Sequence, residues 1–125
     1  MAGSKGSKYF DVFLRYKFWL NTKDGENILG EGILNLLKSI ESEGSIQAAA
    51  NKCKISYRKA WGNIKNAEEI LGFSIVEKKR GGKDGGNTSL TDDGKNLLLA
   101  FDKLKKEFDK SIYNIAKEFF NKLNK

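Results

Sequence analysis

Residues 44–72 read GSIQAAANKCKISYRKAWGNIKNAEEILG, and this segment is the most informative about the fold. Ser45 stands where a serine caps a helix, and the small residues after it predict a short helix over 46–52. After a connection of about three residues, Ser56 is suited to cap a longer helix that runs to about Leu71. Two helices joined so closely predict a helix-turn-helix.

The longer helix of this pair has an apolar side and a polar side. Its apolar residues recur at helical spacing and predict one packed stripe: Ala60, Trp61, Ile64, Ala67 and Leu71. We therefore expect Trp61 to pack in the core rather than to stack on a base. Tyr57, at the edge of the stripe, either packs in the core or offers its hydroxyl to a phosphate. Gly62 lies on the polar side, where it either permits close approach to a groove or occurs there by chance.

The residues before this pair predict a strand, a turn and a helix. From Phe10 to Leu20 every second residue is apolar, a pattern typical of a strand with one buried side. Residues 21–25 read NTKDG, which predicts a turn, and Glu26 to Leu29 predicts a short return strand. Apolar residues at helical spacing then predict a helix that ends near Glu43, where Gly44 is suited to the left-handed conformation.

The residues after the pair predict a hairpin and a long helix. Ser74 to Lys79 reads as a strand, residues 80–87 as a glycine-rich tip, and residues 88–90 as a return strand. Such a hairpin after a helix-turn-helix is the wing of a winged helix. Thr91 is suited to cap a last helix that runs to about Asn124.

The last helix keeps an apolar stripe along its whole length. The stripe consists of Leu97, Phe101, Leu104, Phe108, Ile112, Ile115, Phe119 and Leu123. A helix of about 33 residues is roughly 50 Å long, which exceeds the size of a small domain. Because an exposed stripe of that length needs a partner, we expect a two-fold homodimer. The alternative is a break near Ser111 that folds the helix back onto its own core.

The fold class expected from these elements is α+β, mainly α. We expect a winged helix-turn-helix with an N-terminal strand or hairpin and a long C-terminal dimerisation helix. The expected division of the chain is a disordered N-terminal arm over residues 1–9, the winged helix-turn-helix over 10–90, and the dimerisation helix over 91–125.

Composition narrows the classes of function. The 125 residues suit one domain, and no apolar run approaches the length of a membrane span. The single cysteine favours a cytoplasmic chain without a disulfide. The chain has no histidine, so the usual zinc sites and histidine-dependent catalytic arrangements cannot form. We therefore expect no metal, no cofactor, no catalytic residue and no enzyme, and no membrane partner.

The positive charge indicates a polyanionic partner. The net charge is +7, and residues 51–67 contain five basic residues and no acidic residue. An exposed face that is merely solvated is the commoner explanation of such a run. The adjacent helix-turn-helix favours double-stranded DNA instead, because such a motif places its second helix in the major groove.

The candidate contacts to DNA fall into two groups. Arginine and asparagine can read guanine and adenine edges, so the base-edge candidates are Arg58, Lys59, Asn63 and Asn66. The phosphate candidates are Ser45, Lys52, Lys54, Ser56, Tyr57, Lys65, Arg80 and Lys83. The last two lie among glycines at the hairpin tip, where a plain turn is the alternative. That tip lacks the GxxxxGK[ST] pattern of a nucleotide-binding loop.

Two rival functions remain open at this point. The winged helix could hold a protein partner, with the charge serving only solubility. The chain could also bind RNA, although the predicted strands do not present an evident set of stacking aromatic residues. Affinity for DNA that falls steeply with salt would separate the first interpretation from these rivals.

The run GSIQAAANKCKISYRKAW, residues 44–61, resembles the GSI-x-x-AA…SY-x-x-AW signature of the DNA-binding domain of ModE regulators, which respond to molybdate. The resemblance continues into the glycine-rich wing and upstream into LGEG, and covers roughly residues 10–105. It implies a LysR-like winged helix-turn-helix that dimerises and binds operator DNA. The helix from Ser56 to Asn66 would then enter the major groove, and the wing would touch the backbone.

Full-length members of that family carry C-terminal molybdate-binding modules of the TOBE or Mop type. No part of this sequence can be assigned to such a module. We therefore expect a transcriptional regulator without its own effector-binding domain, or one whose sensor is a separate effector-sensing protein.

Overall fold

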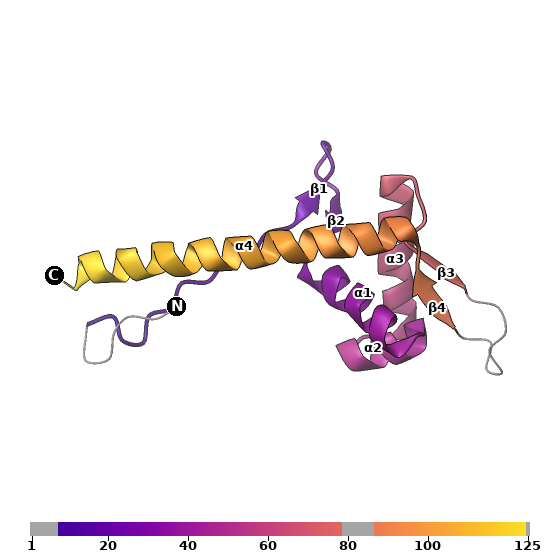
Figure 1. Ribbon diagram of the computed structural model, residues 1–125, viewed down its shortest axis with the longest axis horizontal. Coiled ribbons are helices and arrows are strands. Elements are labelled where there is room, and N and C mark those ends of the chain that lie inside the picture. The colour runs from indigo at the N-terminus through magenta and orange to yellow at the C-terminus, as the bar shows by residue number, and fades with distance from the viewer. Residues whose placement is uncertain (1–7, 79–86, 125) are drawn as a thin grey trace. The chain divides into compact units, whose positions relative to one another are not determined.

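The computed structural model describes residues 8–78 and 87–124, which fall into two compact units. One unit is Phe18–Phe101, and the other combines Met1–Lys17 with Asp102–Lys125. The elements in chain order are β1 (Leu20–Asn21), β2 (Asn27–Leu29), α1 (Glu31–Glu43), α2 (Ile46–Cys53), α3 (Tyr57–Leu71), β3 (Val76–Lys78), β4 (Thr88–Leu90) and α4 (Asp92–Leu123). The mainly α winged helix-turn-helix fold is confirmed (Figure 1).

The helix ends follow the expected capping chemistry. Ser45 Oγ accepts a hydrogen bond from the Ala48 N–H, and Ser56 Oγ accepts one from the Lys59 N–H, each at 3.0 Å. Gly44 ends α1 with φ of 79°, in the left-handed region that glycine adopts without strain. These local contacts fix where α2 and α3 begin, and therefore how α3 is presented.

The core of the Phe18–Phe101 unit lies between the three short helices, the hairpin and the start of α4. Its largest fully buried side chains are Leu29, Leu34, Leu36, Leu37, Ile40, Ile64, Ile75 and Leu90. Alanines of α2 and α3 are fully buried as well, which lets these two helices pack closely. Figure 1 shows α1, α2 and α3 gathered beside the β3–β4 hairpin.

The predicted wing hairpin is confirmed at its base. β3 and β4 are antiparallel, with Val76 opposite Leu90 and Lys78 opposite Thr88. The base is joined to the start of α4, because the Thr91 N–H donates to the Ile75 carbonyl at 2.9 Å. The predicted tip contacts Arg80 and Lys83 lie outside the described residues.

The strand predicted from Phe10 to Leu20 is wrong over most of its length. Only Leu20–Asn21 forms a strand, paired with the three residues of β2, and α1 begins two residues after β2 ends. So short a partner leaves residues 14–19 without a ladder, and Phe13 takes part in an isolated bridge. Most of the expected buried side is exposed instead, and Phe10 is 45% exposed. Its one half-buried member, Phe18, packs against the core and stacks on Phe101. Of the predicted arm 1–9, residues 1–7 lie outside the described residues, while Lys8 and Tyr9 belong to a turn.

The second unit contains the later part of α4. Within it Ala116 and Phe120 are buried, and the Tyr16 hydroxyl donates a hydrogen bond to the Asp109 carboxylate. That bond is the main reason why the pKa of Asp109 lies below its usual value, and the ion pair with Lys105 adds to the effect.

The predicted dimerisation stripe has two environments. Phe101 is buried in the core of the Phe18–Phe101 unit, and Leu97 packs partly against the same core. Leu104 and Ile112 are half-buried. The exposed members of the stripe all follow residue 107: Phe108, Ile115, Phe119 and Leu123.

Among residues 8–78 and 87–124, no helix has the length and apolarity to cross a bilayer.

Candidate nucleic-acid interface

The candidate interface centres on α3, whose two sides differ as predicted. Ala60, Ile64 and Ala67 are buried, and Trp61 is half-buried against the core. Tyr57 is exposed at the edge of this stripe. At 100° per residue, the other exposed residues lie on the side away from the stripe: Arg58, Lys59, Gly62, Lys65, Asn66 and Glu69. α3 therefore presents a solvent-exposed side with three basic residues, one amide, one glycine and one acid.

The base-edge candidates occupy this side of α3 and its border. Arg58, Lys59 and Asn66 are exposed, whereas Asn63 is half-buried at the border facing α1. Asn63 and Lys59 line a hollow of about 680 Å³ with Asn35 and Lys38 of α1. Three candidates can therefore reach a ligand in front of α3, and Asn63 lies beside them.

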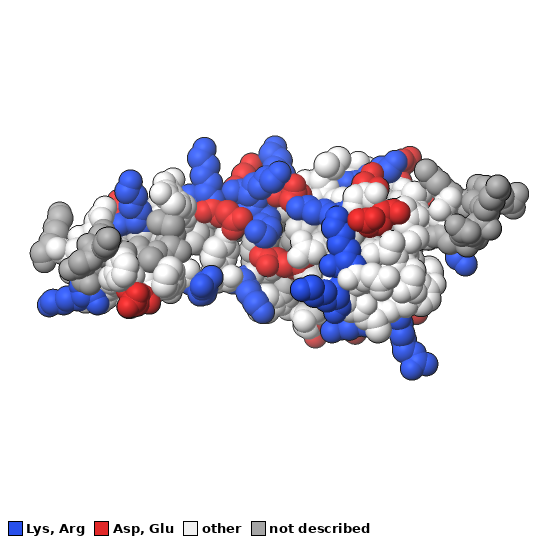
Figure 2. Space-filling view, turned by 90° about the horizontal axis from the view of Figure 1, so that it is seen from below, with Lys and Arg blue, Asp and Glu red and all other residues white. Residues whose placement is uncertain are grey.

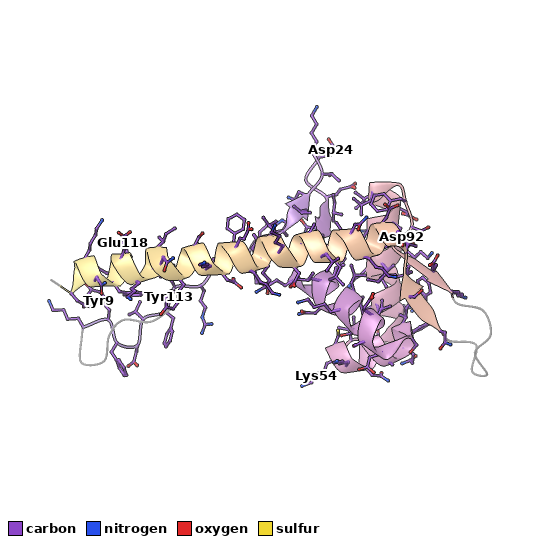
Figure 3. The ribbon with its side chains drawn as sticks, in the orientation of Figure 1. Tyr9, Asp24, Lys54, Asp92, Tyr113 and Glu118 are labelled. Carbon is purple, nitrogen blue, oxygen red and sulfur yellow. The ribbon has the colours of Figure 1, made fainter. Side chains whose placement is uncertain are left out.

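The described phosphate candidates belong to α2, α3 and the residues that cap them. Ser45 and Ser56 each accept a backbone N–H as caps, and their hydroxyl protons can still be donated. Lys54 ends α2 with φ of 60° and is exposed, and Figure 3 labels it at the end of that helix. Lys52 pairs with Glu43 at 3.4 Å, so its charge is partly offset. Single contacts of this kind between exposed groups contribute little to stability and exchange readily.

Tyr57 and Lys65 both contact Trp61. The Trp61 Nε1–H donates to the Tyr57 hydroxyl at 2.5 Å, and the two rings meet edge to face. Lys65 Nζ lies 4.9 Å from the centre of the Trp61 ring. Tyr57 is nevertheless 46% exposed, so its hydroxyl stands at the edge of the candidate interface.

Glu68 links α3 to the start of β3, a contact within the protein that the sequence analysis missed. Its Oε2 accepts the backbone N–H of Ile75 at 2.7 Å and that of Val76 at 3.3 Å. Its Oε1 is 3.2 Å from Lys65 Nζ. Burial raises the pKa of this carboxyl, but the two N–H groups and Lys65 outweigh that effect and hold the pKa below its ordinary value of 4.5. In the sequence Glu68 is simply one of two adjacent glutamates, and no local pattern marks it.

Charge alone does not outline the interface. The face drawn in Figure 2 carries basic and acidic side chains intermingled. In the part of the chain that the structure describes, no group of three or more acidic or cysteine side chains could hold a metal ion. The candidate site is identified by the exposed side chains of α3, which include Arg58, Lys59 and Asn66.

Curated regulators are similar in sequence to much of this chain. The protein is 34% identical over 85 residues to the transcriptional regulator ModE of Haemophilus influenzae, a match that covers 68% of this chain and 33% of the relative. It is 38% identical over 71 residues to the DNA-binding transcriptional dual regulator ModE of Escherichia coli, covering 57% and 27% of the two chains. The chain thus spans about a third of the length of these curated relatives.

Solved structures share the fold. The crystal structure of the BenM_DBD/benA site 1 DNA complex has a TM-score of 0.56 and 24% identity, covering 71% of this chain and 94% of that one. The CbnR_DBD–DNA complex has a TM-score of 0.59 and 17% identity, covering 72% and 98%. Residues 33–95, from α1 to the start of α4, match the model of the bacterial regulatory helix-turn-helix protein, lysR family. This match spans half of the chain and includes α2 and α3, so the chain belongs to the lysR family of bacterial regulatory helix-turn-helix proteins.

Proposed function

We propose that the protein is a transcriptional regulator that binds double-stranded operator DNA through α3. The observation that carries this proposal is the exposed side of α3, where Arg58, Lys59 and Asn66 stand opposite a buried alanine and isoleucine stripe. These side chains match the donors and acceptors that base edges offer in the major groove. The membership of the lysR family and the DNA named for the structural neighbours support the same interpretation.

The proposed division of labour follows the geometry. Arg58, Lys59, Asn63 and Asn66 read base edges. Phosphates are contacted by Ser45, Ser56, Lys54 and the exposed edge of Tyr57, with Lys52 and Lys65 exchanging their carboxylate partners for phosphates. Arg80 and Lys83 are also proposed to contact phosphates, and this assignment rests only on their positions in the sequence. A cytoplasmic location is part of the proposal and is supported by the single cysteine.

We propose further that two copies assemble through α4. The exposed apolar residues after position 107, which include Phe108, Ile115 and Phe119, support this assembly. A two-fold dimer presents two α3 helices to two half-sites, which raises both affinity and the length of sequence that is read.

Footprinting on DNA upstream of the protein's own gene and neighbouring genes tests the proposed function. We expect protection of a pseudo-palindromic site whose half-sites are about one helical turn apart. The control is the Arg58→Ala variant, which should lose this protection. Uniform weak protection along every fragment, unchanged in the variant, would contradict sequence-specific regulation.

A further inference from the structure

One flank of α3 carries a continuous row of side-chain contacts. Tyr57, Trp61, Lys65 and Glu68 follow one another at intervals of four, four and three residues, so they lie one above the next. The Trp61 indole donates to Tyr57, Lys65 lies over the indole ring, and Lys65 pairs with Glu68. The row begins at the first turn of α3 and ends on the Glu68 carboxylate.

Glu68 connects this row to the base of the wing. Its carboxylate accepts the N–H groups of Ile75 and Val76, which begin the chain leading into β3. The same short segment is held by Thr91, the residue that caps α4, because its hydroxyl donates to the carbonyls of Ser74 at 2.7 Å and Ile75 at 3.2 Å. The N–H groups at the base of the β3–β4 hairpin are therefore bound by α3, and the carbonyl groups by Thr91.

The negative charge of Glu68 opposes the binding of a polyanion. A carboxylate close to the DNA-binding helix repels phosphates, and by this argument alone an uncharged residue would bind better. The side chain is only 11% exposed, and both of its oxygens are bonded to donors of the protein itself. Its contacts are thus directed at the wing base rather than at solvent or a ligand.

We propose that Glu68 is a positioning residue, which fixes the base of the wing against α3 so that both reach DNA in one geometry. This inference rests on the proposed function. Glu68 itself does not touch DNA. Its effect passes through Ile75 and Val76 to the hairpin, and these two contacts remain when Lys65 exchanges Glu68 for a phosphate.

Two variants that remove the same charge test this role. Glu68→Gln removes a carboxylate that binds the wing base, and Glu69→Gln removes the adjacent, exposed carboxylate. Electrostatics predicts that either variant binds DNA at least as tightly as the parent protein, since each gains one unit of positive charge. We expect this result for Glu69→Gln. For Glu68→Gln we expect operator affinity to fall about tenfold, the scale of losing one charge-assisted hydrogen bond.

A hydroxyl-radical footprint at saturating protein separates positioning from loss of stability. The ratio of protection at the flanks, where the wing reaches, to protection at the centre of each half-site does not depend on the folded fraction. We expect Glu68→Gln to lower this ratio and Glu69→Gln to preserve it. If Glu68→Gln does not fold, Glu68→Asp is measured in its place with the same expectation, because its carboxylate is one methylene short of the N–H groups.

Equal affinity and an unchanged protection ratio in the Glu68 and Glu69 variants would overturn the inference while leaving the proposed function intact. Failure of the parent protein to footprint any site would instead refute the proposed function.

Discussion

Two glycines inside helices have opposite roles at the scale of single residues. A Cβ at Gly94 would lie 2.2 Å from the Ile75 carbonyl oxygen, whereas a Cβ at Gly62 would meet no atom within 4 Å. We expect Gly94→Ala to lower the free energy of unfolding by about 1–3 kcal/mol through overpacking. Gly62→Ala should raise it by about 1 kcal/mol through helix propensity. Urea unfolding of both variants checks this contrast, and a stable Gly94→Ala protein would show that α4 is not packed closely on Ile75.

Arg58 and Lys54 should differ in what they contribute to DNA binding. Arg58 stands on the exposed side of α3, so Arg58→Ala should cost about 1–3 kcal/mol on the operator and little on random DNA. Lys54→Ala should weaken binding to both DNAs similarly and reduce the salt slope by about one unit. Fluorescence anisotropy on the two DNAs measures both effects. Equal losses on operator and random DNA for Arg58→Ala would remove Arg58 from base reading.

The link between α3 and β3 gives stability a specific dependence on pH. The pKa of Glu68 is lower in the folded state than in the unfolded state, where it is near 4.5. Its contribution to the free energy of unfolding is therefore fully present above the unfolded-state pKa and is lost as pH falls through the folded-state pKa. We expect the difference in unfolding free energy between the parent protein and Glu68→Gln to shrink as pH falls below 4.5. The Glu69→Gln difference serves as the control. A Glu68→Gln difference that stays constant down to complete protonation would contradict the ionised contact.

The elements themselves differ in how far the sequence predicts them. Ser45, Ser56 and Thr91 cap helices as expected, because a cap depends on residues three positions away. The alternation from Phe10 to Leu20 does not produce a long strand, because a strand also needs a partner, and β2 offers only three residues. The role of Glu68 could not be predicted for a similar reason, since its partners Ile75 and Val76 lie across a turn. Local chemistry could be predicted from sequence, and contacts between elements could not.

At the scale of the whole molecule, the apolar stripe of α4 is the proposed interface between two copies. Ile115 is 56% exposed on the apolar stripe of α4, whereas the adjacent Asn114 is an exposed polar residue off that stripe. We expect Ile115→Asp to convert a dimer into a monomer and to weaken operator binding, because a buried charge would be unpaired in the interface. Asn114→Asp adds the same charge and should remain dimeric. Light scattering distinguishes the 14.0 kDa chain from twice that mass. A dimeric Ile115→Asp protein would place the interface elsewhere.

The proposed function requires that α3 and its surroundings bind double-stranded DNA. The most direct measurement is the affinity of the intact chain for its footprinted operator, and for RNA of the same sequence, between about 50 and 200 mM salt. With about six phosphate contacts, log K for the operator should fall linearly with log salt concentration at a slope near −5. RNA should bind far more weakly at every salt concentration. Affinity for the operator that is independent of salt, or equal affinity for RNA, would contradict the binding of double-stranded DNA by α3.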